Sequence, residues 1–299
     1  MYLTADSPLS IKPLSTSHPK PWRKLDDEGS WTKEYREKLL EEINGLKFED
    51  EGIGTIRILL LGQIKAGKSS FVNTLASIDK NRIAEITRAG GADKSLTFAL
   101  KEYTPTGALK KNICILDTMG YEEAQFGLNV KDIIYLVKGN ICPGYKFNPA
   151  SPIEQDSAYY RPNPQKSDRI HCIVFVADAN IFGQDNVTAG AMQKQKELDE
   201  ALREDVARCV LLTKIDVLCQ SVETDVTNTY RSEKVKQAVQ RAAEFFCVQE
   251  RNILPIKNYE KETATDTKIE ILILLALRQM MRFAKDFYDG SASGQTPET

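Results

Sequence analysis

Residues 62–70, with the sequence GQIKAGKSS, have the composition and spacing of a phosphate-binding loop. Gly62 is followed by Gly67, Lys68 and Ser69 in the pattern G-x-x-x-x-G-K-S. In such a strand-to-helix turn, consecutive backbone N–H groups point at one concavity, and the helix N-terminus adds a positive dipole end. Glycine is needed where a side chain would collide with phosphate or force an unfavourable backbone angle. The stretch therefore predicts a nucleotide-phosphate site.

The individual positions of this loop have separate expected roles. Lys68 is expected to bridge the β- and γ-phosphates, the Ser69 hydroxyl to bind Mg²⁺, and Ser70 to reach the α-phosphate. The rest of the cradle is expected to consist of Gly62, Gln63, Ile64, Lys65, Ala66 and Gly67. The alternative is a solvated Gly/Lys turn. An apolar run before the loop and an amphipathic pattern after it favour phosphate binding over that alternative.

Two later patterns bear on which nucleotide is bound. In DTMG, Asp117 can hold the Mg²⁺ shell through water and the N–H of Gly120 can detect a γ-phosphate. This pattern is weak by itself, because many strands end in a turn with Asp and Gly. In TKID, the carboxylate of Asp216 can accept hydrogen bonds from N1–H and the 2-amino group of guanine, and adenine offers neither donor. Guanine is therefore favoured over adenine.

The other residues of this base-binding pattern are less regular. The stem of Lys214 is expected to pack along the base and the phosphate loop. Thr213 stands where Asn is commoner, and this substitution is expected to weaken the link back to the phosphate loop. A further contact, from a backbone N–H to guanine O6, should follow the last strand, and Asn258 in KNYE is the candidate.

Hydrolysis requires groups beyond the loop, and the candidates for catalysis are Lys68, Lys65 and Thr97. A threonine must close over Mg²⁺ and the γ-phosphate; Thr97 fits by its place at a strand start, and Thr87 is the alternative. Position 121 is Tyr rather than the Gln that orients water in Ras-like enzymes, so turnover is expected to be slow. Lys65 lies where guanylate-binding proteins carry an Arg that reaches the transferred phosphate, although a loop lysine is more often solvated.

The elements that must position these groups alternate along the chain. Apolar or alternating runs predict strands at 55–62, 95–104, 112–118, 169–178, 206–214 and 252–259. Helical patterns cover 66–78, 130–139, 192–205, 232–247 and 267–287, and an earlier helix is expected to begin at a Ser30 N-cap and end near Gly45. This alternation predicts an α/β fold, with a mostly parallel sheet, helices on both faces and an N-terminal helical extension.

Composition and organisation limit the function classes. The chain has 299 residues, a net charge of −2 and a pI of about 5.9, which argues against nucleic-acid binding. We expect an N-terminal arm and flanking helix at 1–52, a P-loop domain at 53–289 with an insertion at 139–168, and a disordered tail at 290–299. The N-terminus has no signal-peptide pattern and no apolar run is long enough to span a membrane, so a cytoplasmic protein is expected. The six cysteines form no C-x-x-C pair and are expected to be reduced.

The P-loop, DxxG and [NT]KxD patterns, in this order along the chain, resemble the TRAFAC-type GTPase domain. Some large GTPases, such as dynamins, also carry Thr at the first position of the [NT]KxD pattern. More specifically, the loop, DTMG, KSDRIHCIVFVAD, LLTKID, PWRKLD and above all ILILLALRQMMRFAKDF resemble the interferon-induced protein 44 family. The resemblance covers about 21–288 and implies a cytoplasmic, interferon-inducible, GTP-binding protein of innate immunity with an antiviral or immune-regulatory effect. Ile64 and Lys65 differ from the small residues usual in the family's loop.

Three functions are compatible with these residues. The first is a slow GTPase that uses GTP/GDP and Mg²⁺; the second is a nucleotide-gated scaffold with little hydrolysis; the third is a P-loop kinase or ATPase, which the TKID pattern opposes. A protein partner and a nucleotide-dependent homodimer are expected. Three roles remain for the 139–168 insertion: a dimer contact, a lid or a partner site. Its aromatic side chains are nevertheless expected to pack against its own domain. These are Tyr145, Phe147, Tyr159 and Tyr160.

Overall fold

The computed structural model describes residues 18–25, 31–47, 53–87, 99–110, 112–118, 120, 128–148, 150–183, 187–202 and 206–292. Its centre is a six-stranded sheet with the order β2-β3-β1-β4-β5-β6. The strands are β1 (Ile56–Gly62), β2 (Lys101–Tyr103), β3 (Ile113–Asp117), β4 (Cys172–Asp178), β5 (Ala207–Thr213) and β6 (Ile253–Pro255). Strand β2 runs antiparallel to β3, and the other neighbours are parallel. The prediction of a mostly parallel sheet is thus confirmed.

The sheet is buried on both faces, which explains why its central strands are mostly apolar. Strands β1, β4 and β5 consist mainly of Ile, Leu, Val, Phe and Cys rather than of alternating polar and apolar residues, and Arg57, Asp178 and Arg208 are the charged residues within them. The predicted strand at 95–104 is only three residues long among the described residues, from Lys101 to Tyr103, and residues 88–98 lie outside the described part of the chain.

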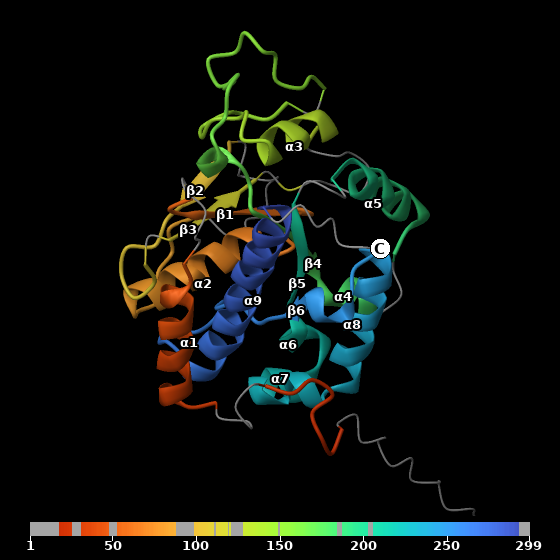
Figure 1. Cartoon of the computed structure of the whole chain (residues 1–299). Helices are drawn as coiled ribbons and strands as arrows, with labels where there is room; N and C mark the ends of the chain where they lie inside the picture. Colours follow the sequence, from red (N-terminus) through yellow and green to blue (C-terminus); the bar gives the residue numbers. More distant parts are fainter. Residues whose placement is uncertain are drawn as a thin grey trace, which may run out of the picture.

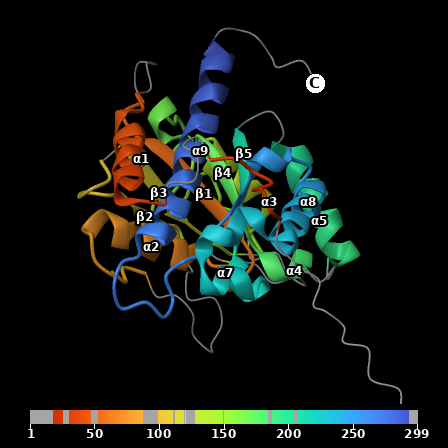
Figure 2. The same ribbon diagram turned by 90° about the horizontal axis from the view of Figure 1, so that it is seen from below.

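Helices cover the sheet on both sides. They are α1 (Lys33–Gly45), α2 (Lys68–Lys80), α3 (Val130–Val137), α4 (Ala179–Gly183), α5 (Ala189–Leu202), α6 (Ile215–Leu218), α7 (Gln220–Thr224), α8 (Glu233–Phe245) and α9 (Thr267–Ala292). In Figure 2, α4, α5 and α8 lie on the opposite side of the molecule from α1 and α2. The short helices α4, α6 and α7 have too few residues to show a period, so the sequence did not predict them.

Helix α9 organises the face on which the N-terminal helix packs. It contacts β1, β4, β5 and β6, and α1 lies beside it (Figure 1). The two helices are joined by Arg36 with Glu270 and by Arg278 with Glu42, the latter at 2.7 Å. The predicted helix end at Gly45 is confirmed, but the expected Ser30 cap is wrong. Thr32 is the N-cap, because its hydroxyl accepts the N–H of Tyr35 at 3.3 Å.

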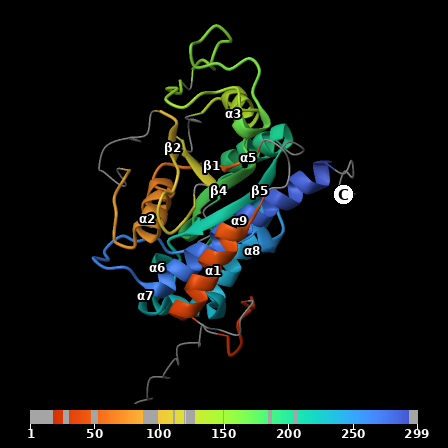
Figure 3. The same ribbon diagram turned by 60° about the vertical axis from the view of Figure 1, so that its left-hand side comes forward.

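The 139–168 insertion is built on α3. Asp132 of α3 is fully buried and accepts the N–H of Ile153 at 2.8 Å. The N–H of Leu100 donates to the carbonyl of Tyr145 at 3.0 Å, which ties the insertion to the start of β2. The Tyr160 ring of the insertion lies edge to face with the Tyr135 ring of α3 at 5.4 Å, so an aromatic side chain does pack the insertion against its own domain. Figures 1 and 3 show the insertion at the end of the molecule opposite α7.

Two further features of the described residues concern membranes and thiols. Within the part of the chain that the structure describes, no helix has the length and apolar character needed to cross a membrane. All six cysteines are free thiols, and the Cys172 and Cys209 sulfur atoms, on neighbouring strands, lie 3.9 Å apart in the core. Burial raises the pKa of the Cys209 thiol, so this thiol stays protonated.

Candidate functional site

The phosphate loop connects the end of β1 at Gly62 to the start of α2 at Lys68. Lys65 and Gly67 have φ angles of 65° and 99°, so the turn is tight and its second glycine occupies a left-handed conformation. A Cβ on Gly62 would lie 2.1 Å from the carbonyl oxygen of Val176 in β4. This glycine is therefore required by the close approach of the neighbouring strand.

Lys68 lies across this loop with its amine turned inward. Its Nζ donates to the carbonyls of Gly62 at 2.8 Å and Gln63 at 2.9 Å, and only 6% of the residue is exposed. Burial lowers the pKa of the Lys68 amine to about 8, and the nearby Asp117 carboxylate opposes this shift. The amine is thus a poorly solvated cation that an added anion would stabilise.

Ser69 and Asp117, two of the residues that the sequence predicts as metal ligands, meet beside this lysine. The Ser69 hydroxyl donates to one carboxylate oxygen of Asp117 at 2.8 Å. The other oxygen, Oδ1, is buried, and no described residue donates to it. Burial raises the pKa of the Asp117 carboxyl. A hydroxyl and a carboxylate with an unpartnered oxygen are donors that fit Mg²⁺, which prefers hard oxygen ligands.

The two threonine candidates for closing the metal site differ in what the structure describes. Thr97 lies outside the described residues. The Thr87 hydroxyl lies near the loop, within 3.1 Å of the Ser69 carbonyl and 3.0 Å of the Asn73 side-chain oxygen. Thr87 is therefore placed beside Ser69, although its hydroxyl contacts the start of α2 rather than the Ser69 and Asp117 side chains.

Gly120 lies directly against the loop. A Cβ at this position would lie 2.8 Å from the Ile64 backbone and 2.9 Å from the Lys68 Nζ. Only glycine fits this approach without displacing the loop backbone. The N–H of the DxxG pattern thus belongs to a residue in contact with the phosphate loop, where the sequence expected it.

The base-binding pattern follows β5 and opens α6. Lys214 has a φ of 58°, and its Nζ forms an ion pair with Asp178 at 2.7 Å. Asp216 lies in the first turn of α6, and burial raises the pKa of its carboxyl. Asp178, at the end of β4, was missed by sequence reasoning. The signal for it was its place in VAD at the carboxyl end of a strand, where ligand-binding residues of parallel sheets gather.

Thr213 and Asn258 reach the phosphate loop from two different strand ends. The Thr213 hydroxyl donates to the Ala66 carbonyl at 2.7 Å and lies 3.1 Å from the Ala177 carbonyl. Threonine therefore makes a direct bond to the loop, and whether this link is weaker than the one that Asn would make stays a prediction. Asn258 donates from Nδ2 to the Gly67 carbonyl at 3.3 Å, so its side chain lies at the loop.

The remaining loop residues differ in burial. Ala66 is buried, whereas Gln63, Ile64 and Ser70 are half-buried. Lys65 is exposed, and the structure does not place it against Lys68 or Ser69 through any described bond. The sequence prediction of a catalytic role for Lys65 stays a prediction.

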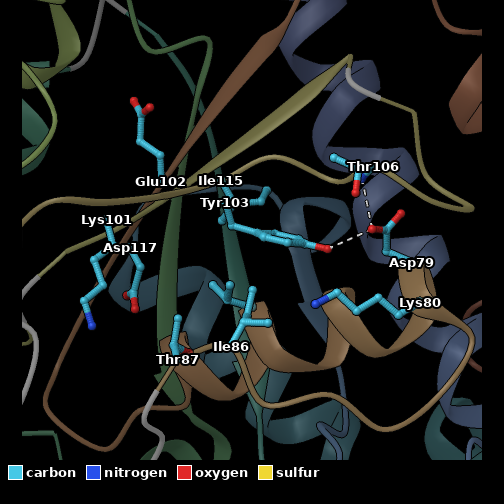
Figure 4. A pocket seen from close by; sticks show the side chains of 11 residues that line it. Asp79, Lys80, Ile86, Thr87, Lys101, Glu102, Tyr103, Thr106, Ile115 and Asp117 are labelled. Atoms are coloured by element: carbon cyan, nitrogen blue, oxygen red, sulfur yellow. Dashed lines mark hydrogen bonds between the residues drawn. The ribbon is translucent and has the colours of Figure 1, made fainter.

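A cavity of about 480 Å³ lies between α2 and strands β2 and β3 (Figure 4). Its floor includes Ile86 and Ile115, and Asp117 closes one end. On another wall, the Tyr103 hydroxyl donates to Asp79 at 3.2 Å. The sequence carried no signal for this cavity, because its walls come from segments that are far apart along the chain.

Comparisons with solved structures bear on the fold. Toc33 from Arabidopsis thaliana, in a dimerization-deficient mutant, superposes with a TM-score of 0.50 at 15% identity, covering 88% of this chain and 97% of that one. A structure of the chloroplast translocon components atToc33 and psToc159, for which dimerization is described as important for GTPase activity, gives 0.50 at 16% identity over 83% and 90%. The fold is therefore that of P-loop GTPases, as predicted.

Comparisons with curated proteins bear on the family. No family model matches the chain. It is 32% identical over 264 residues to human interferon-induced protein 44-like, and 31% identical over 256 residues to mouse interferon-induced protein 44. These alignments cover 86% and 84% of the chain but only 58% and 60% of those proteins, so the chain spans about three fifths of their length. The matches identify it as a member of the interferon-induced protein 44 family over the part of those proteins that it covers.

Proposed function

We propose that this protein binds GTP and GDP together with Mg²⁺ and hydrolyses GTP slowly. The observation that carries the proposal is the convergence of Lys68, the Ser69–Asp117 pair and Gly120 on one turn. Asp216 lies in the first turn of α6, just after β5, which is two strands away from β1 in the sheet. The P-loop GTPase fold of the solved structures supports the same assignment, and the GTPase activity described for the translocon components agrees with it.

In this proposal, different residues bind the phosphates, the Mg²⁺ ion and the guanine base. The ammonium of Lys68 and the N–H groups at the start of α2 would hold the phosphates, and the Asp216 carboxylate would accept the two guanine donors. The Ser69 hydroxyl and Asp117 would hold Mg²⁺, which when bound neutralises charge on the phosphates. Gly120 would place its N–H near the terminal phosphate. Lys214, held by Asp178, would line the base.

A second candidate function is a nucleotide-gated scaffold that binds GTP or GDP with little hydrolysis. It is favoured by Tyr121, which stands where Ras-like enzymes carry a water-orienting Gln. Binding of labelled GTP, GDP and ATP at millimolar Mg²⁺, followed by a phosphate-release assay, separates the candidates. GTP binding with release supports the GTPase, and GTP binding without release supports the scaffold. A preference for ATP would contradict both.

The names of the relatives support a proposal about the cellular role. We propose that the protein is interferon-induced and acts in innate immunity in the cytoplasm, with an antiviral or immune-regulatory effect. Nucleotide-dependent homodimerization is part of this proposal, since dimerization is described for the translocon components of the same fold. The proposed organisation is a flanking region at 1–52, a P-loop domain at 53–289 and a tail at 290–299. Sedimentation with GDP and with a non-hydrolysable GTP analogue tests the dimer.

Replacing the exposed loop lysine tests the catalytic proposal for this position. In Lys65→Ala, we expect GTP turnover to fall about tenfold while the Kd for GTP stays unchanged, because a point charge near the transferred phosphate acts mainly in the transition state. Phosphate release under single-turnover conditions measures the rate, and fluorescence titration measures the Kd. Unchanged turnover would show that this side chain is merely solvated.

Nucleotide binding should take up protons above neutral pH. The pKa of Lys68 is lowered to about 8 by burial, so the free protein loses this proton as the pH rises through 8. Phosphate stabilises the charged form, so binding at pH 9 should take up close to one proton, and affinity should fall by up to about tenfold per pH unit above 8. The unfolded chain keeps the proton to its ordinary pKa of 10.5, so the stability of the free protein should rise between pH 8 and 10.5.

Calorimetry measures this proton uptake directly. Titrations at pH 7 and pH 9 in buffers of different ionisation enthalpy give the number of protons taken up at each pH. Equal values near zero at both pH values would contradict the assignment of a phosphate-bound Lys68 amine.

A further inference from the structure

Two consecutive peptide groups of the phosphate loop are held from outside by side chains. The carbonyl of Ala66 accepts the Thr213 hydroxyl at 2.7 Å, and the carbonyl of Gly67 accepts the Asn258 Nδ2 at 3.3 Å. Both side chains also pack against Gly67, since a Cβ there would lie 3.2 Å from the Asn258 Nδ2 and 3.4 Å from Thr213. The two anchors therefore act on one short stretch of backbone.

These anchors determine where the backbone N–H groups point. A peptide group is planar and trans, so its N–H points away from its C=O. Holding the Ala66 carbonyl outward directs the N–H of Gly67 inward, and holding the Gly67 carbonyl outward does the same for the N–H of Lys68. Those two N–H groups lie at the N-terminus of α2, where a phosphate is bound in loops of this type.

The Gly67 carbonyl also accepts the N–H of Phe71 at 2.9 Å in the first turn of α2, so Asn258 adds a second donor to this carbonyl from outside the helix. Gly67 has a φ of 99° and, having no Cβ, can leave this conformation at little steric cost. Thr213 is short and reaches only the first of the two carbonyls. Asn258 reaches the second from the segment after β6, and the N–H of the next residue, Tyr259, donates to the Thr74 hydroxyl of α2 at 3.1 Å. The segment is thus attached to the loop and to its helix.

We propose that Asn258 is a positioning residue for phosphate: its carboxamide, together with the Thr213 hydroxyl, sets the direction of the two N–H groups that bind the β-phosphate. This role is separate from the contact of its backbone with guanine that the sequence suggested. The proposal rests on nucleotide binding at this loop, which the wild-type protein tests by itself.

Asn252 provides a matched control for Asn258, because the two residues lie before and after the same strand, β6. Asn252 precedes β6 and donates from Nδ2 to the Arg208 carbonyl at 3.1 Å, a bond of the same kind away from the loop. Asn258→Ala and Asn252→Ala each remove one such bond, so their effects on the melting temperature of the free protein should be similar. Only Asn258→Ala should weaken GDP and GTP binding, by about fivefold, which is the effect of one net hydrogen bond.

Thr213→Val provides a second variant, because valine keeps the shape of the side chain and removes the hydroxyl. It should also weaken GDP binding about fivefold, and the double variant should weaken it by at least roughly twenty-fold. The ³¹P resonance of the β-phosphate in bound GDP reports the orientation of the N–H donors. It should shift in Asn258→Ala and in Thr213→Val and stay in place in Asn252→Ala.

The outcomes separate this inference from the proposed function. If the wild-type protein binds no guanine nucleotide, the proposed function fails. If the wild type binds GDP, and Asn258→Ala matches Asn252→Ala in both GDP affinity and the ³¹P shift, nucleotide binding stands and the positioning role of Asn258 is refuted.

Discussion

Replacing Asp216 by asparagine is expected to change the base preference of the site from guanine to xanthine. The carboxylate would accept two hydrogen bonds from guanine, whereas an asparagine amide would set an N–H₂ donor against the guanine 2-amino donor. Xanthine carries an oxygen in place of that amino group and matches the amide. Losing two charge-assisted bonds in a partly buried site should weaken GTP binding by about a hundredfold or more.

Competition titrations with GTP, xanthosine triphosphate and ATP measure this change. The conservative control is Asp156→Asn, an exposed residue of the insertion, which should leave all three affinities unchanged. Burial raises the pKa of the Asp216 carboxyl, so the neutral amide should also leave the free protein no less stable. A variant that retained wild-type GTP affinity and gained none for the xanthine nucleotide would refute the assignment of the base site.

Replacing Lys68 by methionine is expected to abolish tight nucleotide binding without unfolding the protein. Methionine keeps an unbranched apolar stem but removes the cation that would contact two phosphates, so affinity should fall by about a hundredfold or more. The free protein should remain at least as stable near pH 7, because the lowered pKa of Lys68 shows that burial disfavours its charge. Thermal melts with and without GDP measure both effects at once.

The control for this variant lies on the same helix. Lys80→Met changes an exposed lysine at the other end of α2 and should retain the full rise in melting temperature on adding GDP. If Lys68→Met also retained that rise, the phosphate would have to be held elsewhere, and the loop would be no more than a structural turn.

Much of the fold was predictable because the deciding interactions are local. The apolar strands β1, β4 and β5, the amphipathic helix α8 and the long α9 were predicted within a few residues of their observed ends. The cap of α1 was placed wrongly, because Ser30 and Thr32 are both good capping residues and only the observed Thr32–Tyr35 bond distinguishes them. The insertion at 139–168 was predicted, but its internal arrangement was not, because it has no period and is held by single contacts such as that of Asp132 with Ile153.

The sequence by itself determined the phosphate loop, the DxxG and TKID patterns and the alternation that brings them to one edge of a parallel sheet, because backbone hydrogen bonding and side-chain period act over a few residues. Only the tertiary structure decided which side chains complete the site. Asp178 holds Lys214 across 36 residues, Thr213 reaches Ala66 across 147, and Asn258 reaches Gly67 across 191. Such contacts depend on which strands become neighbours, and no local pattern in the chain records that choice.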